Sequence, residues 1–219
     1  TIKNRDDHLQ KLYAEEVQAP VIVCYSAESR EPMPHTSKKQ PPQKLSAADW
    51  IRFAEQEFSK HGVDAVRVEP LAKKLSVTKG SFYWHFKTRR ELLDSIIADW
   101  KRRSTSAVIE RLSEGGLTPQ ERLKALFLLP FRRGQEVDVT NLEIAIRNCS
   151  LSDKAFAAVV ADVDAVRLQY IAENFVALGN DAETAHLKAL RFYCVMQGLP
   201  QIARKDNQAE IEGIFLSLL

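Results

Sequence analysis

The stretch LAKKLSVTKGSFYWHF, residues 71–86, decides the fold predicted for this chain. Leu71 and Leu75 recur at helical spacing, which indicates a short helix with one apolar side. This helical spacing of apolar residues ends after Leu75. Thr78 then has a hydroxyl suited to capping a second helix over residues 79–85. Two short helices joined by a tight turn form a helix-turn-helix. The sequence therefore predicts an all-α protein that carries this motif.

The charge pattern around this motif indicates a nucleic-acid partner. Residues 73–90 contain six Lys or Arg and no Asp or Glu. DNA binding is dominated by neutralisation of phosphates, so an acid-free basic window is the expected signature. Residues 44–103 carry thirteen basic and eight acidic side chains, a net charge of +5, and the whole chain carries +2, which leaves −3 elsewhere. The alternative is a solvated surface with a chance run of lysines, and the helix-turn-helix spacing argues against it.

Residues 48–93 resemble the DNA-binding domain of the TetR family of bacterial transcriptional regulators. The resemblance runs through FAEQEFSKHGVDAVRVEPLAKKLSVTKGSFYWHFKTRREL, and the SFYWHF core with its basic tail is the most specific part. Ser76 stands where the family usually has glycine. If this position requires a positive φ, the serine is strained by about 1 kcal/mol. Arg89 stands where lysine is commoner in the family, and both side chains can bind a phosphate.

The resemblance and the side-chain chemistry together assign roles at the DNA. Lys79 is the best candidate for a base contact, because lysine can donate to O6 and N7 of guanine. Gly80 would permit close approach of the helix to the groove, and Tyr83 and His85 would hold phosphates. Trp84 is expected to pack in the core. The complete predicted DNA-binding set is Lys73, Thr78, Lys79, Gly80, Ser81, Tyr83, His85, Lys87 and Arg89.

Helical patterns continue through the rest of the chain. Residues 44–90 are expected to form the DNA-binding domain, with a first helix from Ser46 to a stop at Gly62 and a second helix from Val68. Residues 91–219 are expected to form a larger helical bundle. Its helices are predicted at about 89–113, 118–130, 141–149, 153–178, 181–199 and 208–218, with a loop at 132–136.

The TetR resemblance implies a function for that bundle. Family members are homodimers that grip a palindromic operator on double-stranded DNA and are released by a small-molecule effector, so we expect a repressor that dimerises through residues 182–218. An effector pocket between helices would be lined by apolar side chains with a few polar anchors. The candidate pocket residues are Phe127, Arg147, Asn148, Tyr170, Tyr193 and Met196. Glu143 and Arg147 can equally form a helix salt bridge.

Other chemistries find no support in the sequence. The five histidines are scattered without HExxH spacing, and there is no glycine-rich phosphate loop or GxSxG turn, so we expect no enzyme, metal or cofactor. The three cysteines form no CxxC or disulfide framework, which favours a reducing cytoplasm. Cys149 and Cys194 could sense oxidants, but lone cysteines on apolar helical faces are usually inert core. No stretch reads as a signal peptide or membrane span.

Residues 1–43 form a leader that the resemblance does not cover. Residues 6–18 could form an amphipathic helix that docks on the body or on a partner subunit, and residues 29–43 read as a proline-rich linker. The alternative is a tail without a role in DNA binding. For the whole chain, the alternative function is an all-helical ligand-binding protein that no longer reads DNA.

Overall fold

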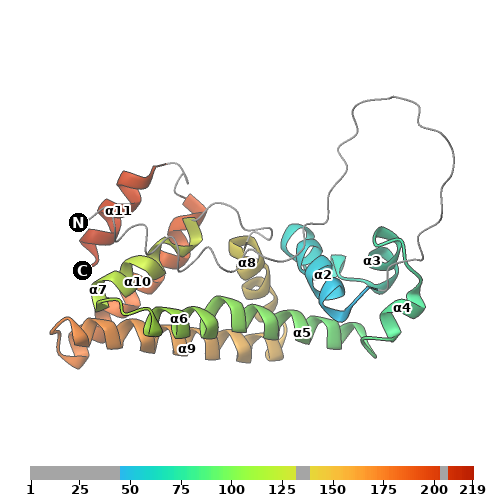
Figure 1. Ribbon diagram of the computed structural model, residues 1–219, viewed down its shortest axis with the longest axis horizontal. Coiled ribbons are helices and arrows are strands. Elements are labelled where there is room, and N and C mark those ends of the chain that lie inside the picture. Colours follow the sequence, from blue (N-terminus) through green and yellow to red (C-terminus); the bar gives the residue numbers. More distant parts are fainter. Residues whose placement is uncertain (1–44, 132–138, 203–206) are drawn as a thin grey trace. The chain divides into compact units, whose positions relative to one another are not determined.

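The computed structural model describes residues 45–131, 139–202 and 207–219, and this part of the chain is helical throughout, without a strand (Figure 1). The α-helices are α2 (Ala47–His61), α3 (Val68–Lys74), α4 (Lys79–Tyr83), α5 (Arg89–Lys101), α6 (Ala107–Glu114), α7 (Pro119–Leu128), α8 (Val139–Ser150), α9 (Lys154–Ala177), α10 (Ala182–Ile202) and α11 (Gln208–Ser217). Short 3₁₀ turns lie at Val63–Ala65 and Leu129–Phe131. The predicted all-α class is confirmed. The leader 1–43 and the loop 132–136 lie outside the described residues.

Local capping signals place most helix ends where the sequence predicts them. The Ser46 side chain accepts a hydrogen bond from the backbone N–H of Asp49, and the Asp49 carboxylate accepts one from the backbone N–H of Ser46 at 2.8 Å. Thr118 and Glu121 repeat this capping box at the start of α7. Gly62 ends α2 with a φ of 78°, which glycine adopts without a steric penalty.

The helix-turn-helix itself agrees with the prediction in position and differs in detail. The turn residue Ser76 has a φ of 56°, so the condition under which a serine is strained at this position is met. Thr78 precedes α4 as predicted, but its side chain makes no capping hydrogen bond. Instead its carbonyl oxygen accepts from the N–H of Ser81 at 3.0 Å. The helix ends at Tyr83, two residues earlier than expected.

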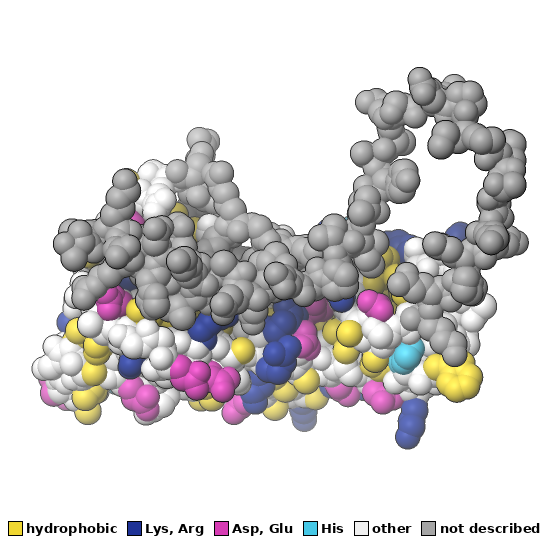
Figure 2. Space-filling view, in the orientation of Figure 1, with side chains coloured by type: hydrophobic (Ala, Val, Ile, Leu, Met, Phe, Trp, Pro, Cys, Tyr) yellow, Lys and Arg dark blue, Asp and Glu magenta, His cyan; other side chains and the backbone are white. Residues whose placement is uncertain are grey.

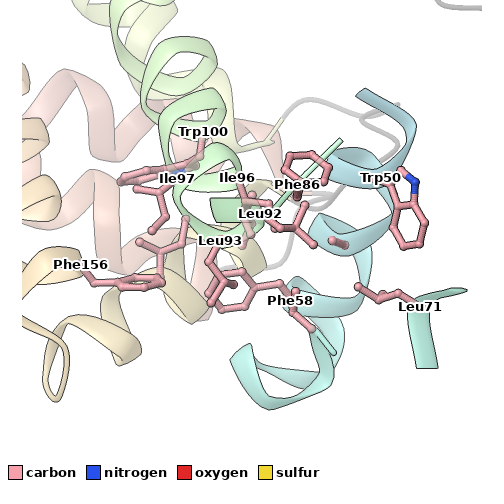
Figure 3. Packing of buried hydrophobic residues seen from close by; sticks show 14 of the residues in the cluster. Trp50, Phe58, Leu71, Phe86, Leu92, Leu93, Ile96, Ile97, Trp100 and Phe156 are labelled. Carbon is pink, nitrogen blue, oxygen red and sulfur yellow. The ribbon is translucent and has the colours of Figure 1, made fainter. Parts of the chain in front are cut away.

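Buried aromatic and aliphatic side chains hold α2, α3 and α4 against α5. Trp50 and Phe82 meet edge to face with ring centroids 5.4 Å apart. Figure 3 shows Phe58, Leu71 and Phe86 in the same cluster as residues of α5. Leu75, expected in this core, is half-buried. Helices α2, α3 and α4 therefore share one core with α5, and residues of α8 and α9 contribute to it as well.

The long helix predicted over residues 89–113 is interrupted by a π turn at Arg102–Ser106, between α5 and α6. At its end the N–H of Ala107 donates to the carbonyl of Arg102, five residues back. Two side chains bond to the backbone here. The Ser104 hydroxyl donates to the carbonyl of Trp100 at 2.7 Å, and Arg167 of α9 donates to the carbonyl of Ser104 at 3.2 Å. Such contacts compete with the regular helix ladder.

The second half of the chain packs around α9, which lies along α5 and α6 in Figure 1. Phe127 of α7, Phe192 of α10 and Phe215 of α11 meet in one aromatic cluster, with Phe127 5.4 Å from Phe192 and 5.7 Å from Phe215 between ring centroids. Val166 of α9 is exposed. None of the helices in the described ranges combines the length and apolar character required to cross a membrane.

Candidate nucleic-acid interface

Helix α4 has one buried and one exposed side. Phe82 is fully buried, whereas Lys79, Gly80 and Tyr83 are exposed, Tyr83 to 60%. Trp84, which follows the helix, is 87% exposed, so the expectation that it packs in the core is wrong. Because α4 ends at Tyr83, the chain turns before Trp84, and Phe86 takes the inward position instead. The outward side of α4 is the face predicted to enter a groove.

Lys79, the predicted base-reading residue, forms an ion pair with Glu69 in the first turn of α3. Both side chains are more than half exposed, and the hydrogen bond from Lys79 holds the pKa of Glu69 below its usual range. The pair lies in an open groove of about 300 Å³ whose other polar walls are Arg67 and Tyr83. Glu69 was not among the predicted site residues, because it lies ten positions before Lys79 on a different helix.

The other predicted DNA-binding residues divide into two groups. Lys73, Thr78 and Lys87 are exposed, as a phosphate contact requires, and Ser81 is half-buried. The remaining two, His85 and Arg89, bond to backbone carbonyls of the same chain.

His85 lies with Nε2 2.7 Å from the carbonyl oxygen of Leu45. Arg89 is half-buried, and its guanidinium donates to the carbonyls of Val63 at 2.6 Å and Val66 at 2.5 Å. These bonds attach the segment after α2 to the start of α5. We therefore correct the assignment of Arg89: its guanidinium has an internal structural role in place of the predicted phosphate contact.

Charge on the rest of the visible surface is mixed. Figure 2 shows Lys and Arg side chains interspersed with Asp and Glu side chains on the face in view, without a large patch of one sign. Ion pairs also occur at the edge of the basic window, where Arg90 pairs with Asp94 and Asp153, both at 2.7 Å. The acid-free basic window of residues 73–90 therefore remains distinctive within the described part of the chain.

A buried ion pair ties α2 to the π turn. Glu55 of α2 is only 3% exposed, and its carboxylate pairs with Arg103 of the π turn. Arg103 also donates to Asp99 at 2.6 Å. Burial raises the pKa of Glu55 from 4.5 to about 7, against the opposing effect of the Arg103 guanidinium. The carboxyl group of Glu55 therefore titrates near neutral pH.

The opposite side of the same π turn contacts a buried polar network in the second half of the chain. Arg167 is 6% exposed and donates to Glu143 at 2.8 Å and to the Thr105 hydroxyl at 3.0 Å. Arg147 pairs with Glu143 at 2.9 Å, as the i, i+4 spacing predicted, and with Asp164 at 2.6 Å. Two arginines and two carboxylates thus neutralise one another.

Tyr193 completes this network. Its hydroxyl donates to Asp164 at 2.6 Å, and burial raises its pKa to about 12.

Of the six predicted pocket residues, the structure brings Arg147 and Tyr193 into direct contact, with Nη2 of Arg147 2.9 Å from the Tyr193 hydroxyl. Phe127, Tyr170 and Met196 are buried, whereas Arg147 and Tyr193 are engaged in the ion network. Asn148 is exposed and lines a different groove, of about 430 Å³, between α8 and the end of α2.

The two described cysteines differ in their surroundings. Cys149 is half-buried, and burial raises the pKa of its thiol. Cys194 is exposed, contrary to the expectation of a core position.

Comparison with known proteins agrees with this arrangement of helices. Residues 51–96, which include α3 and α4 and reach into α5, match the sequence model of the bacterial regulatory proteins of the tetR family. Residues 51–96 therefore carry the sequence signature of this family. A probable HTH-type transcriptional regulator, ArpR, of Pseudomonas putida is 30% identical over 84 residues. That match covers 38% of this chain and 40% of the regulator's length.

Solved structures of low identity share the fold. A protein from Rhodococcus sp., provisionally assigned to the TetR-family transcriptional regulators, superposes with a TM-score of 0.64 at 18% identity, over 78% of this chain and 95% of its own. A Saccharomonospora viridis protein crystallised in complex with choline has a TM-score of 0.63 at 16% identity, over 78% of this chain and 92% of its own. The shared fold therefore extends beyond α2, α3 and α4, which we call the head, to the helices that follow them.

Proposed function

We propose that this tetR-family chain is a sequence-specific DNA-binding transcriptional regulator, a repressor that a small-molecule effector releases from a palindromic operator in the cytoplasm. The observation that carries the proposal is the exposed side of α4, where Lys79, Gly80 and Tyr83 face outward while Phe82 anchors the helix in the core. A recognition helix needs this combination, since its base-reading side must be free while its orientation is fixed. In this proposal residues 44–90 bind DNA and residues 91–219 bind the effector and the second subunit.

An apolar face on α10 and α11 supports dimerisation through residues 182–218. Leu187 and Leu190 of α10 lie three residues apart on one side of the helix and are 60% and 43% exposed. Leu216 of α11 is 63% exposed. Covering these leucine side chains with a second copy of the chain would be favourable, because it removes apolar surface from water. Two heads related by a two-fold axis would then reach half-sites about 34–36 Å apart.

Two unsatisfied polar groups in α9 support an effector site in the second half of the chain. The Tyr170 hydroxyl and Oδ1 of Asn174 are buried without a hydrogen-bond partner among the described residues, and Nδ2 of Asn174 donates to the carbonyl of Tyr170 at 2.8 Å. A buried polar atom without a partner is costly, so a ligand that bonds to it gains affinity. An effector that binds the DNA-incompetent conformation more tightly shifts the population away from DNA.

Fluorescence offers a direct test, because Trp84 is a natural probe. The structure describes all three tryptophans of the sequence, and Trp50 and Trp100 are buried while Trp84 is 87% exposed beside the proposed interface. We expect a duplex from the upstream region of the chain's own gene to shift Trp84 emission and to protect it from acrylamide, with an affinity that falls steeply as salt rises. No binding of any duplex at low salt would refute the proposal and favour a ligand-binding protein of the same fold.

Substitution of Lys79 then tests the assigned residue. Lys79→Ala should cost about 1–3 kcal/mol of binding free energy and relax the preference at one base pair. The matched control is Lys124→Ala, because Lys124 of α7 also forms a partly exposed ion pair, with Glu212 at 3.5 Å. An equal loss on every sequence would instead identify Lys79 as a phosphate contact.

A further inference from the structure

The surface proposed to meet DNA carries one carboxylate beside its base-reading lysine. The basic window of residues 73–90 contains no acid, yet α3 brings Glu69 into contact with the ammonium group of Lys79. Side chains that face phosphates are normally basic or neutral, since a carboxylate there is repelled by the DNA. A carboxylate at this position therefore needs an explanation.

Stability does not explain Glu69 well. Its side chain is 70% exposed and that of Lys79 is 57% exposed, and ion pairs so accessible to solvent contribute little to folding. Glu69 lies in the first turn of α3, where a negative charge has a small favourable interaction with the helix dipole. That interaction would be served equally by a carboxylate that points away from Lys79.

Geometry links the two side chains to one target. Glu69 and Lys79 come from different helices and meet in the open groove that Arg67 and Tyr83 also line. Because the Glu69 carboxylate contacts the Lys79 ammonium, a base pair that this ammonium reaches from its observed position is also within reach of the carboxylate. The pair presents a donor and an acceptor side by side.

A G·C base pair has the complementary pattern. In the major groove guanine offers O6 and N7 as acceptors, and the neighbouring cytosine offers a hydrogen of its N4 amine as a donor. An A·T pair also presents an amine, but it lacks the two adjacent guanine acceptors that favour a cation. The donor–acceptor order of the Lys79–Glu69 pair therefore matches G·C better than A·T.

We propose that Glu69 and Lys79 read one G·C pair in each operator half-site as a unit: Lys79 donates to O6 or N7 of guanine, and Glu69 accepts from N4 of the paired cytosine. This inference rests on the proposed DNA-binding function. In this proposal Glu69 determines specificity. At a base pair without the cytosine amine, its carboxylate faces the DNA without a hydrogen-bond donor from the base, and the affinity for that sequence falls.

The experiment compares the wild-type chain with Glu69→Ala, Lys79→Ala and the double variant, by selection from a randomised operator library at one fixed salt concentration. Both single variants should lose the preference at the same G·C pair, by about 10-fold or more, and the double variant should lose no more than the larger single loss. Glu69→Ala should also bind non-specific DNA more tightly than the wild type does. Glu57→Ala is the control, because Glu57 also forms an ion pair with a half-exposed lysine of the head, Lys74, although Glu57 itself is only 13% exposed. The base preferences of this variant should be unchanged.

Two outcomes would overturn the inference while leaving the proposed function intact. In the first, Glu69→Ala binds every duplex more tightly by one common factor with an unchanged preference profile, which makes Glu69 a simple source of repulsion. In the second, Glu69→Ala and Lys79→Ala relax different base pairs. A wild-type chain that binds no duplex would refute both the inference and the proposed function. Circular dichroism spectra and thermal melts of each variant establish that the head remains folded.

Discussion

The Glu55 carboxyl group predicts a pH dependence of stability that one substitution should remove. Glu55 lies in α2, 3% exposed, and pairs with Arg103 of the π turn. Burial outweighs this pairing and raises the pKa of Glu55 from 4.5 to about 7. The perturbation we propose is Glu55→Gln, which keeps the shape of the side chain and an oxygen that can accept from Arg103 but cannot ionise.

The sign follows from the protons bound in each state. Between pH 4.5 and 7 the folded chain holds a proton on Glu55 that the unfolded chain has released, so the free energy of unfolding falls as pH rises through this window. One pKa unit corresponds to about 1.4 kcal/mol, so the interval from 4.5 to about 7 amounts to about 3 kcal/mol. This contribution is fully present below pH 4.5 and absent above pH 7.

The assay is urea unfolding followed by circular dichroism at pH 5 and pH 8, at one protein concentration and ionic strength. Carboxylates with lowered pKa values, such as Asp99, contribute stability with the opposite pH dependence, so the comparison between variant and wild type is the informative quantity. Relative to the wild type, Glu55→Gln should gain about 2–3 kcal/mol between pH 5 and pH 8.

A second carboxylate of the same helix provides the control. Glu57 is 13% exposed and pairs with the half-exposed Lys74, and we expect Glu57→Gln to change stability by the same amount at both pH values. If instead the stability of Glu55→Gln runs parallel to that of the wild type from pH 5 to pH 8, the reasoning fails. In that case Glu55 would be ionised in the folded chain throughout, and Arg103 would outweigh its burial.

Three further predictions concern the head. Ser76→Gly should raise the free energy of unfolding by about 1 kcal/mol in urea titrations, since glycine relieves the strain of a φ of 56°, and an unchanged midpoint would contradict this. Gly80→Ala should leave the melting temperature unchanged or raised, because an added Cβ would lie 3.5 Å from the Thr78 hydroxyl, an ordinary contact, but it should weaken operator binding in gel shifts by about tenfold or more. Wild-type affinity would show that no close approach occurs there. Trp84→Ala should unfold within about 0.5 kcal/mol of the wild type, whereas Trp50→Ala should lose about 3–5 kcal/mol.

Local signals made the helix boundaries of the head predictable. The capping box at Ser46, the stop at Gly62 and the positive φ at Ser76 each depend on a few consecutive residues, so a sequence pattern contains the required information. The family resemblance added the orientation of Lys79, whose outward position is confirmed by its exposure. The predicted core position of Trp84 was wrong because it assumed that the helix continues past this residue, and large apolar side chains are usually buried. The helix α4 ends at Tyr83 instead.

The remaining differences arise from contacts between residues far apart in the sequence. Arg89 reads as a phosphate ligand until the fold brings two backbone carbonyls within reach of its guanidinium. Arg147 reads as a pocket anchor until Asp164 and Tyr193 engage it. The π turn at Arg102–Ser106 has no proline or glycine. Its local signal is the hydroxyl of Ser104, which bonds back to the carbonyl of Trp100, whereas Arg167, which also bonds to its backbone, comes from α9. Helical periodicity alone cannot reveal any of these partners.

These contacts make the π turn the junction of two charged networks. On one side Arg103 pairs with Glu55, which is packed in the core of the head. On the other side Arg167 donates to the carbonyl of Ser104 and reaches Tyr193 at 3.3 Å. A continuous series of polar contacts therefore runs from α10 through the π turn to α2. A buried arginine that loses a hydrogen-bonded or charged partner is destabilised. A ligand that displaces Arg167 from this network would therefore alter the π turn, whose backbone connects α5 and the head to α6 and the helices after it.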